Sequence, residues 1–173
     1  QGGSNIIFRI MNQTGIQLAR HLREVCFGGN WTSVHFENVM GKILWTEATH
    51  PVHGVNNILR IFYHSFYYVE ALHDVLTGRE LNAHDEYSFN HTPVHSDEDW
   101  KKLQMKFWRT AEDTARMLEK TPDEKFLESF TDERYGTYYR NVLGTIEHLH
   151  YHLGQIVILH RLLAAKALNV QSL

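Results

Sequence analysis

Hydrophobic residues recur every three or four positions in four long segments of the chain, and no segment shows the sustained alternation of a strand. The four segments span, approximately, residues 5–27, 54–76, 96–120 and 136–167. Residues that stop helices follow the first three segments, namely Gly28, Gly78 and Pro122. The pattern predicts an all-α fold, a single four-helix-bundle domain that covers residues 1–173.

The connections between these segments differ in character. Residues 28–53 contain Trp31 and a short helical piece around residues 36–44. Residues 79–95, between the second and third helices, form a long and irregular polar stretch. A helix start follows it, where Ser96 and Asp99 have the spacing of a capping box. Long connections inside a domain are often functional, which makes this one a candidate functional loop.

Composition narrows the class of protein. With 43% hydrophobic residues and one cysteine among 173 residues, the chain can bury a core and closes no internal disulfide. We expect Cys26 to be a small buried apolar residue rather than a nucleophile. No run of about 18 apolar residues occurs, so we predict no membrane-spanning helix and expect a cytoplasmic protein. The net charge of -3 gives no basic footprint for nucleic acid.

The chain contains 13 histidines, an unusual number for its length, and two of them have the spacing of a chelating pair. His148 and His152 lie four residues apart in the fourth segment, which puts both on one helical face, about 6 Å apart. His150 points to nearly the opposite side. Because the pair adjoins the apolar stripe, its burial requires a partner, and a metal ion is one such partner. The alternative is two polar residues on a solvated face.

A third ligand has to come from another helix. His64 lies in the middle of the second segment, and His73 lies about two and a half turns further along it. A lone histidine on such a helix is more often a hydrogen-bonded core residue than a ligand. Spacing alone therefore leaves His64 and His73 as alternatives.

Two stretches of the sequence together resemble a known family. They are the run NILRIFYH at residues 57–64 and the run HLHYHLGQI at residues 148–156. Both are similar to motifs of the DinB-like superfamily, four-helix-bundle metalloproteins with a histidine on the second helix and HxxxHxGQ on the last. The likeness covers nearly the whole chain, and it implies His64, His148 and His152 as the metal ligands. Gly154 and Gln155 of this motif are either a helix-packing pair or a glycine beside a residue that hydrogen-bonds a ligand.

Three imidazoles leave a divalent ion with open positions, where a thiol or a water is activated. Nitrogen ligation suits zinc or nickel, and also iron or copper. Some members of the family resembled are thiol S-transferases that use low-molecular-weight thiols. The resemblance thus implies a metal-dependent transferase. Alternatives are a metal-dependent hydrolase, or a non-catalytic bundle with a structural metal and a partner-binding surface.

The sequence identifies no catalytic residue beyond the ligands. Candidates for acid–base catalysis near the pair are Glu147, Tyr151 and Tyr68. The aromatic run at residues 62–68 could line a substrate pocket, although such clusters more often belong to the core. We expect a homodimer that pairs through an exposed apolar helix face. A role in acting on DNA, which only the family name evokes, is disfavoured by the acidic net charge.

Overall fold

The computed structural model describes residues 13–170, and over this range the chain folds into helices and contains no strand, as the sequence predicts. Two isolated bridges, Val52 with Val55 and Ser129 with Thr137, are its only β-type pairings there. None of the described helices has the length and apolarity needed to cross a bilayer. The helices are α2 (Gln13–Phe27), α3 (Phe36–Met40), α4 (Trp45–Ala48), α5 (Ile58–Leu76), α6 (Asp97–Lys120) and α7 (Tyr138–Val170), with 3-10 turns η1 (Asp85–Tyr87), η2 (Asp123–Leu127) and η3 (Glu133–Tyr135).

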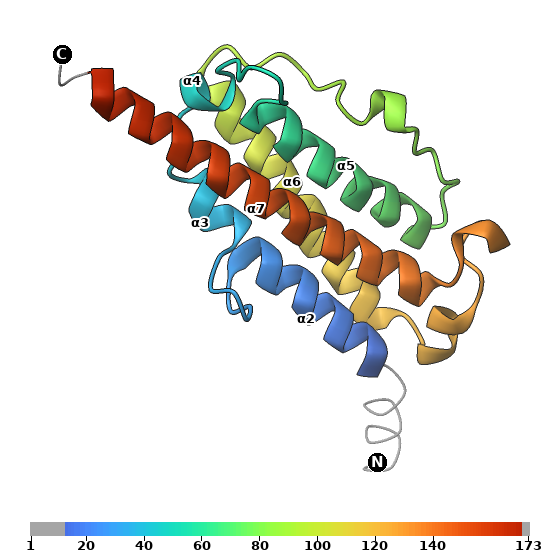
Figure 1. The fold of residues 1–173 in the computed structure, drawn as a ribbon. Helices are drawn as coiled ribbons and strands as arrows, with labels where there is room; N and C mark the ends of the chain where they lie inside the picture. Colours follow the sequence, from blue (N-terminus) through green and yellow to red (C-terminus); the bar gives the residue numbers. More distant parts are fainter. Residues whose placement is uncertain (1–12, 171–173) are drawn as a thin grey trace.

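The four long helices lie side by side, with α7 across the front of the view in Figure 1 and α6 behind it. Both α2 and α5 pack against α6 and against α7. Helix α2 lies close against α6 at Gly15, where a Cβ atom would lie 2.1 Å from the carbonyl oxygen of Leu118. This packing sets α5 directly against α7, the two helices that carry the candidate ligands.

The helix boundaries correct the sequence prediction in places. Residues 5–12 of the first predicted helix lie outside the described residues. The second helix begins at Ile58 rather than at residue 54, because the side chain of Asn57 accepts a hydrogen bond of 2.9 Å from the backbone N–H of Arg60. The fourth helix likewise begins two residues later than predicted, at Tyr138.

The third helix starts where predicted, with a variation on the capping box. The hydroxyl of Ser96 accepts from the backbone N–H of Asp99 at 3.1 Å. The carboxylate of Asp99 accepts from the N–H of His95 at 3.0 Å, one residue earlier than a capping box requires. Both bonds satisfy backbone donors at the end of the long loop and so fix the point where it joins α6.

The aromatic run of α5 divides between the core and the surface. Phe62 and Phe66 are fully buried and pack against Phe107 with ring centroids 5.2 Å and 4.8 Å away. Tyr67 and Tyr68, on the next face of the helix, are only half-buried. The expectation of a core cluster is therefore confirmed for the phenylalanines, and the tyrosines are left to contact the long loop.

The loop between α5 and α6 runs along the outer side of α5 (Figure 1). Two tyrosines of α5 hydrogen-bond this loop. The Tyr67 hydroxyl accepts from the backbone N–H of His84 at 2.9 Å, and Tyr68 donates to the carboxylate of Asp85. Ser88, a residue of this loop, is fully buried. The loop is thus fastened along the helix that carries His64.

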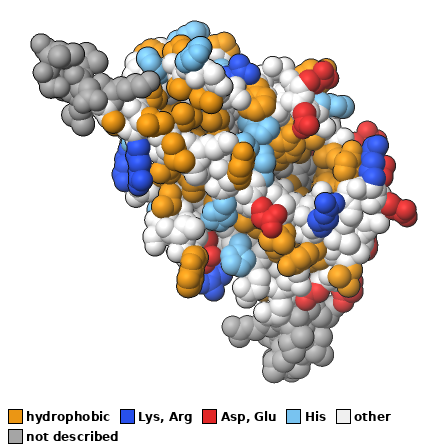
Figure 2. Space-filling model, in the orientation of Figure 1, with side chains coloured by type: hydrophobic (Ala, Val, Ile, Leu, Met, Phe, Trp, Pro, Cys, Tyr) orange, Lys and Arg blue, Asp and Glu red, His pale blue; other side chains and the backbone are white. Residues whose placement is uncertain are grey.

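Hydrophobic side chains gather over the C-terminal half of α7 in the space-filling view (Figure 2). The large apolar residues of α7 that stay exposed there include Ile158 and Leu162, at 61% and 54%. Such a face suits the homodimer expected from the sequence, which stays a prediction.

Candidate metal centre

The imidazoles of His64, from α5, and of His148 and His152, from α7, meet at one point. The Nε2 atom of His148 lies 3.1 Å from that of His64 and 2.9 Å from that of His152. The potential ligand atoms of all three residues lie within 4.8 Å of one another. Two nitrogens bound tetrahedrally to one zinc ion would be about 3.3 Å apart. The spacing is therefore close to the one that a single ion requires.

The far side of two of these rings is held by oxygen atoms. Ser88 Oγ donates its only proton to the carbonyl of Asp85 at 2.7 Å, so it accepts from Nδ1 of His64 at 2.9 Å. Gln155 Oε1 accepts from Nδ1 of His152 at 2.7 Å. A neutral imidazole carries one proton, and here Nδ1 holds it on both rings. Both Nε2 atoms therefore turn a lone pair toward His148.

His148 cannot satisfy these lone pairs by itself. Its Nδ1 atom is buried and has no hydrogen-bond partner among the described residues. With its proton on Nε2, it can bond fully to only one of the two facing nitrogens. With its proton on Nδ1, it buries a donor and directs a third lone pair into the cluster. A divalent cation at the meeting point would satisfy all three nitrogens, so the donor set fits a metal ion.

The electrostatic setting keeps the rings neutral. Burial, with a smaller contribution from the neighbouring His152, lowers the pKa of His64 and that of His148 to about 4. Burial also lowers the pKa of His152. Near neutral pH all three imidazoles are therefore in the unprotonated form that binds metals.

Aromatic rings and a cleft surround the cluster. Phe89 of the long loop stacks on His64 with centroids 4.2 Å apart, and Tyr68 meets His148 edge-on at 5.0 Å. Burial, assisted by the hydrogen bond to Asp85, raises the pKa of Tyr68 to about 12. His148 lines a solvent-connected cleft of about 470 Å³ together with Tyr68 and Glu147. Of the three histidines, His148 thus borders this cleft.

The remaining sequence candidates do not converge with the three histidines. His73, the alternative to His64, faces Asp74 at 3.5 Å and is not among the converging residues. His150 lines a different groove, where burial and the charge of His21 lower its pKa. Tyr151, with 64% of its surface exposed, meets only the edge of His152. Cys26 is fully buried, which raises the pKa of its thiol and agrees with the expected role in the core.

The Gly154–Gln155 pair divides between the two interpretations. Gly154 is exposed and no atom lies within 4 Å of the place where its Cβ would be, so the expected close approach of a neighbouring helix is wrong. Gln155 hydrogen-bonds His152 and so orients one of the candidate ligands.

Sequence reasoning missed the residues of the long loop that complete the cluster. Ser88 and Phe89 contact His64, and Asp85 contacts both Ser88 and Tyr68. The polar character of residues 79–95 marked the loop as a functional candidate without indicating which of its residues face α5. Comparisons with protein-family models, curated proteins and solved structures found no match for this chain.

Proposed function

We propose that this chain is a metal-binding protein in which His64, His148 and His152 hold one divalent ion, and that it is a thiol transferase. The observation that carries this proposal is the fixed orientation of His64 and His152, whose lone pairs converge on His148. Zinc or nickel suits the all-nitrogen site best, with iron or copper as alternatives. The proposal includes membership of the DinB-like superfamily and its four-helix bundle.

The accessibility of the cluster favours an enzyme over a structural site. Structural zinc sites are normally closed by four protein ligands. Here the described residues bring together three candidate ligands, and His148 borders a cleft. An ion at this point would act as a Lewis acid that lowers the pKa of a bound thiol or water.

The proposed transfer forms one bond to sulfur and breaks one bond in the second substrate. The sulfur of the thiol forms a bond to an electrophilic carbon of the second substrate, and the leaving group departs with the electron pair of the bond that breaks. The thiol proton passes to solvent. His64, His148 and His152 would hold the ion as neutral imidazoles, and Gln155 and Ser88 would keep the rings of His152 and His64 in place.

The test is loading of the purified, untagged protein with cobalt(II), followed by titration with a small thiol. We expect about one ion per chain, the absorption of a four-coordinate site, and a sulfur-to-cobalt charge-transfer band when the thiol is added. Absence of a stoichiometric ion would overturn the metal site. Binding of the ion without any response to thiols, together with ester or amide hydrolysis, would replace the transferase with a hydrolase. An ion that exchanges no ligand would make the site structural.

A further inference from the structure

The cleft beside His148 extends along the first turns of α7. Arg140, Gly144 and His148 follow one another at intervals of four residues, so they share one face of the helix and span about 12 Å along its axis. A second cavity, of about 590 Å³, shares Tyr68 with this cleft and adds the apolar side chain of Phe130. A ligand in the cleft therefore has room for a chain longer than a few atoms.

Gly144 lines this cleft between Arg140 and His148. Glycine inside a helix is less favourable than alanine, because it loses more backbone freedom on folding. No atom lies within 4 Å of the place where a Cβ of Gly144 would be, so packing gives no reason for a glycine there. A side chain would instead stand in the cleft between Arg140 and His148. The glycine keeps that path open.

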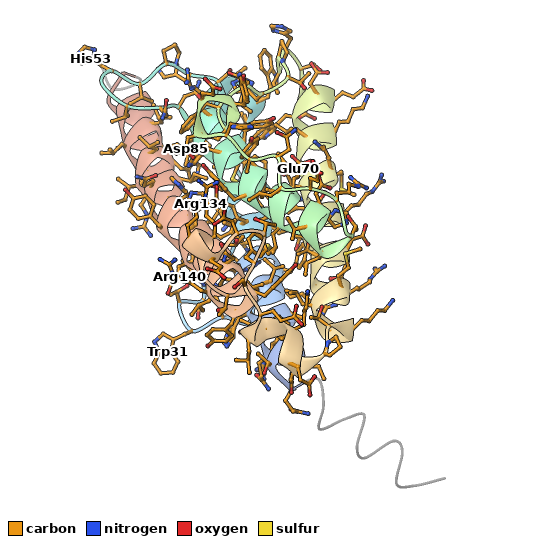
Figure 3. The ribbon with its side chains drawn as sticks, turned by 90° about the vertical axis from the view of Figure 1, so that its right-hand side faces the viewer. Trp31, His53, Glu70, Asp85, Arg134 and Arg140 are labelled. Carbon is orange, nitrogen blue, oxygen red and sulfur yellow. The ribbon has the colours of Figure 1, made fainter. Side chains whose placement is uncertain are left out.

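Arg140 supplies an unneutralised positive charge at the far end of the cleft. Its Nη1 donates to the carbonyl of Tyr135 at 3.3 Å, and no carboxylate lies within ion-pair distance of it among the described residues. The neighbouring Arg134 differs, because it pairs with Asp132 at 3.3 Å and lies over the ring of Tyr135. Figure 3 shows the two arginines on the same side of the molecule.

Glu147 makes the two ends of the cleft differ in charge. It is exposed, it lines the same cleft, and it lies next to His148 at the end opposite Arg140. A negative charge there repels an anionic group from the metal end, whereas the guanidinium of Arg140 attracts it to the other. With five N–H donors and one used on a backbone carbonyl, Arg140 can bind an oxyanion through two parallel bonds.

We propose that this cleft binds an extended thiol with an oxyanion, a carboxylate or a phosphate, which is held by Arg140 while the sulfur reaches the His148 end over Gly144. The assignment rests on the proposed function, because it takes the thiol as the group that approaches the ion. It adds the class of thiol: anionic, and long enough to bridge about two helical turns.

The experiment measures thiol affinity from the charge-transfer band of the cobalt-loaded protein. The probes are mercaptooctanoate, its phosphate counterpart mercaptooctyl phosphate, the neutral mercaptooctanol, and the short mercaptoacetate. We expect one long anionic thiol to bind roughly five- to tenfold more tightly than mercaptooctanol. The better of the two anions identifies the oxyanion. Arg140→Gln removes this preference and leaves the affinity for mercaptooctanol unchanged, and mercaptoacetate gains nothing from Arg140.

Two glycine variants separate ligand binding from helix stability. Gly144→Ala and Gly154→Ala each add one methyl group where no other atom would contact it, and both raise the melting temperature. Only Gly144→Ala weakens the long thiols, because Gly154 lines the other groove. Equal affinities for the anionic and neutral thiols, or a preference that survives Arg140→Gln, overturn this inference and leave the proposed function standing. Failure of every thiol to bind a fully cobalt-loaded protein overturns both.

Discussion

Two faces of α7 carry histidines only two residues apart, and the structure treats them differently. His148 and His152 meet His64 across the contact between α7 and α5, whereas His150 lies half-buried beside a groove on the other face. Burial lowers the pKa of histidines on both faces. A lowered pKa is therefore no mark of a metal site in this molecule.

The difference lies in the convergence with a ring from α5 and, for His64 and His152, in what holds the outer nitrogen of the ring. Gln155 and Ser88 fix the protons of His152 and His64 on Nδ1, and no hydrogen bond holds the ring of His150 among the described residues. The candidate ligand set thus combines convergence from a second helix with partners that fix the tautomer of two of its three rings. A count of histidines, or an i, i+4 pair, provides neither.

The largest effect expected from this contrast is in the metal content of His148→Ala beside His150→Ala. The Nε2 atom of His148 lies 3.1 Å from that of His64 and 2.9 Å from that of His152, so its removal leaves only two of the three candidate ligands. We expect His148→Ala to lose the stoichiometric ion after dialysis and His150→Ala to retain it, as measured by elemental analysis. Unchanged metal content in His148→Ala would eliminate the site.

The next effect comes from the residues behind the ligands. Gln155→Ala and Ser88→Ala each free a ring to change its tautomer, and we expect each to weaken metal binding roughly 10- to 100-fold. Competition with a chromophoric chelator measures the change. Ser65→Ala is the matched control, since it removes an equally buried hydroxyl that bonds only to the carbonyl of Ile61. Equal losses in Ser88→Ala and Ser65→Ala would mean that general packing, not ring orientation, determines affinity.

A moderate effect is expected on the pH dependence of the metal-free protein. The pKa of His64 and that of His148 are about 4 in the folded chain, below the ordinary value of 6.5 that applies when the chain is unfolded. As the pH falls below about 6.5, these two histidines become protonated in the unfolded chain while they stay neutral in the folded chain. The free energy of unfolding therefore decreases between about pH 6.5 and pH 4, and these residues contribute no pH dependence above that window.

Urea unfolding in the presence of a chelator, repeated across that pH range, measures the decrease. His148→Gln removes one of the two histidines whose pKa is about 4 in the folded chain. The stability of this variant should therefore fall less steeply with decreasing pH than that of the unaltered protein. An identical slope in both proteins would show that His148 is not the residue that resists protonation.

The contrast also shows which parts of the site the sequence could predict. Helix geometry alone places His148 and His152 together, because residues four apart share a face whatever surrounds them. The choice of His64 over His73 needed the family resemblance, because the periodicity of one helix does not determine its axial position relative to a neighbouring helix. The helices themselves were predictable to within a few residues, with the largest error at the start of α5, where Asn57 caps the helix.

The rest of the site depends on contacts that no local pattern encodes. The loop that brings Ser88 to His64 has no periodicity, so its register on α5 becomes visible only in three dimensions. The glycines of α7 give the same lesson. The motif drew attention to Gly154, whereas Gly144 lines the cleft that opens onto His148.

The smallest effect is expected from a substitution on the face of α7 that carries His150. Gly154 is exposed on the side of α7 that carries His150, and no atom would contact an added Cβ. Gly154→Ala should therefore raise the free energy of unfolding by about 0.5–1 kcal/mol, the helix propensity difference, and leave metal affinity unchanged. Chemical denaturation and the chelator competition measure the two quantities on the same sample. A loss of metal affinity in this variant would mean that the two faces of α7 are coupled through Gln155, and the separation between them would fail.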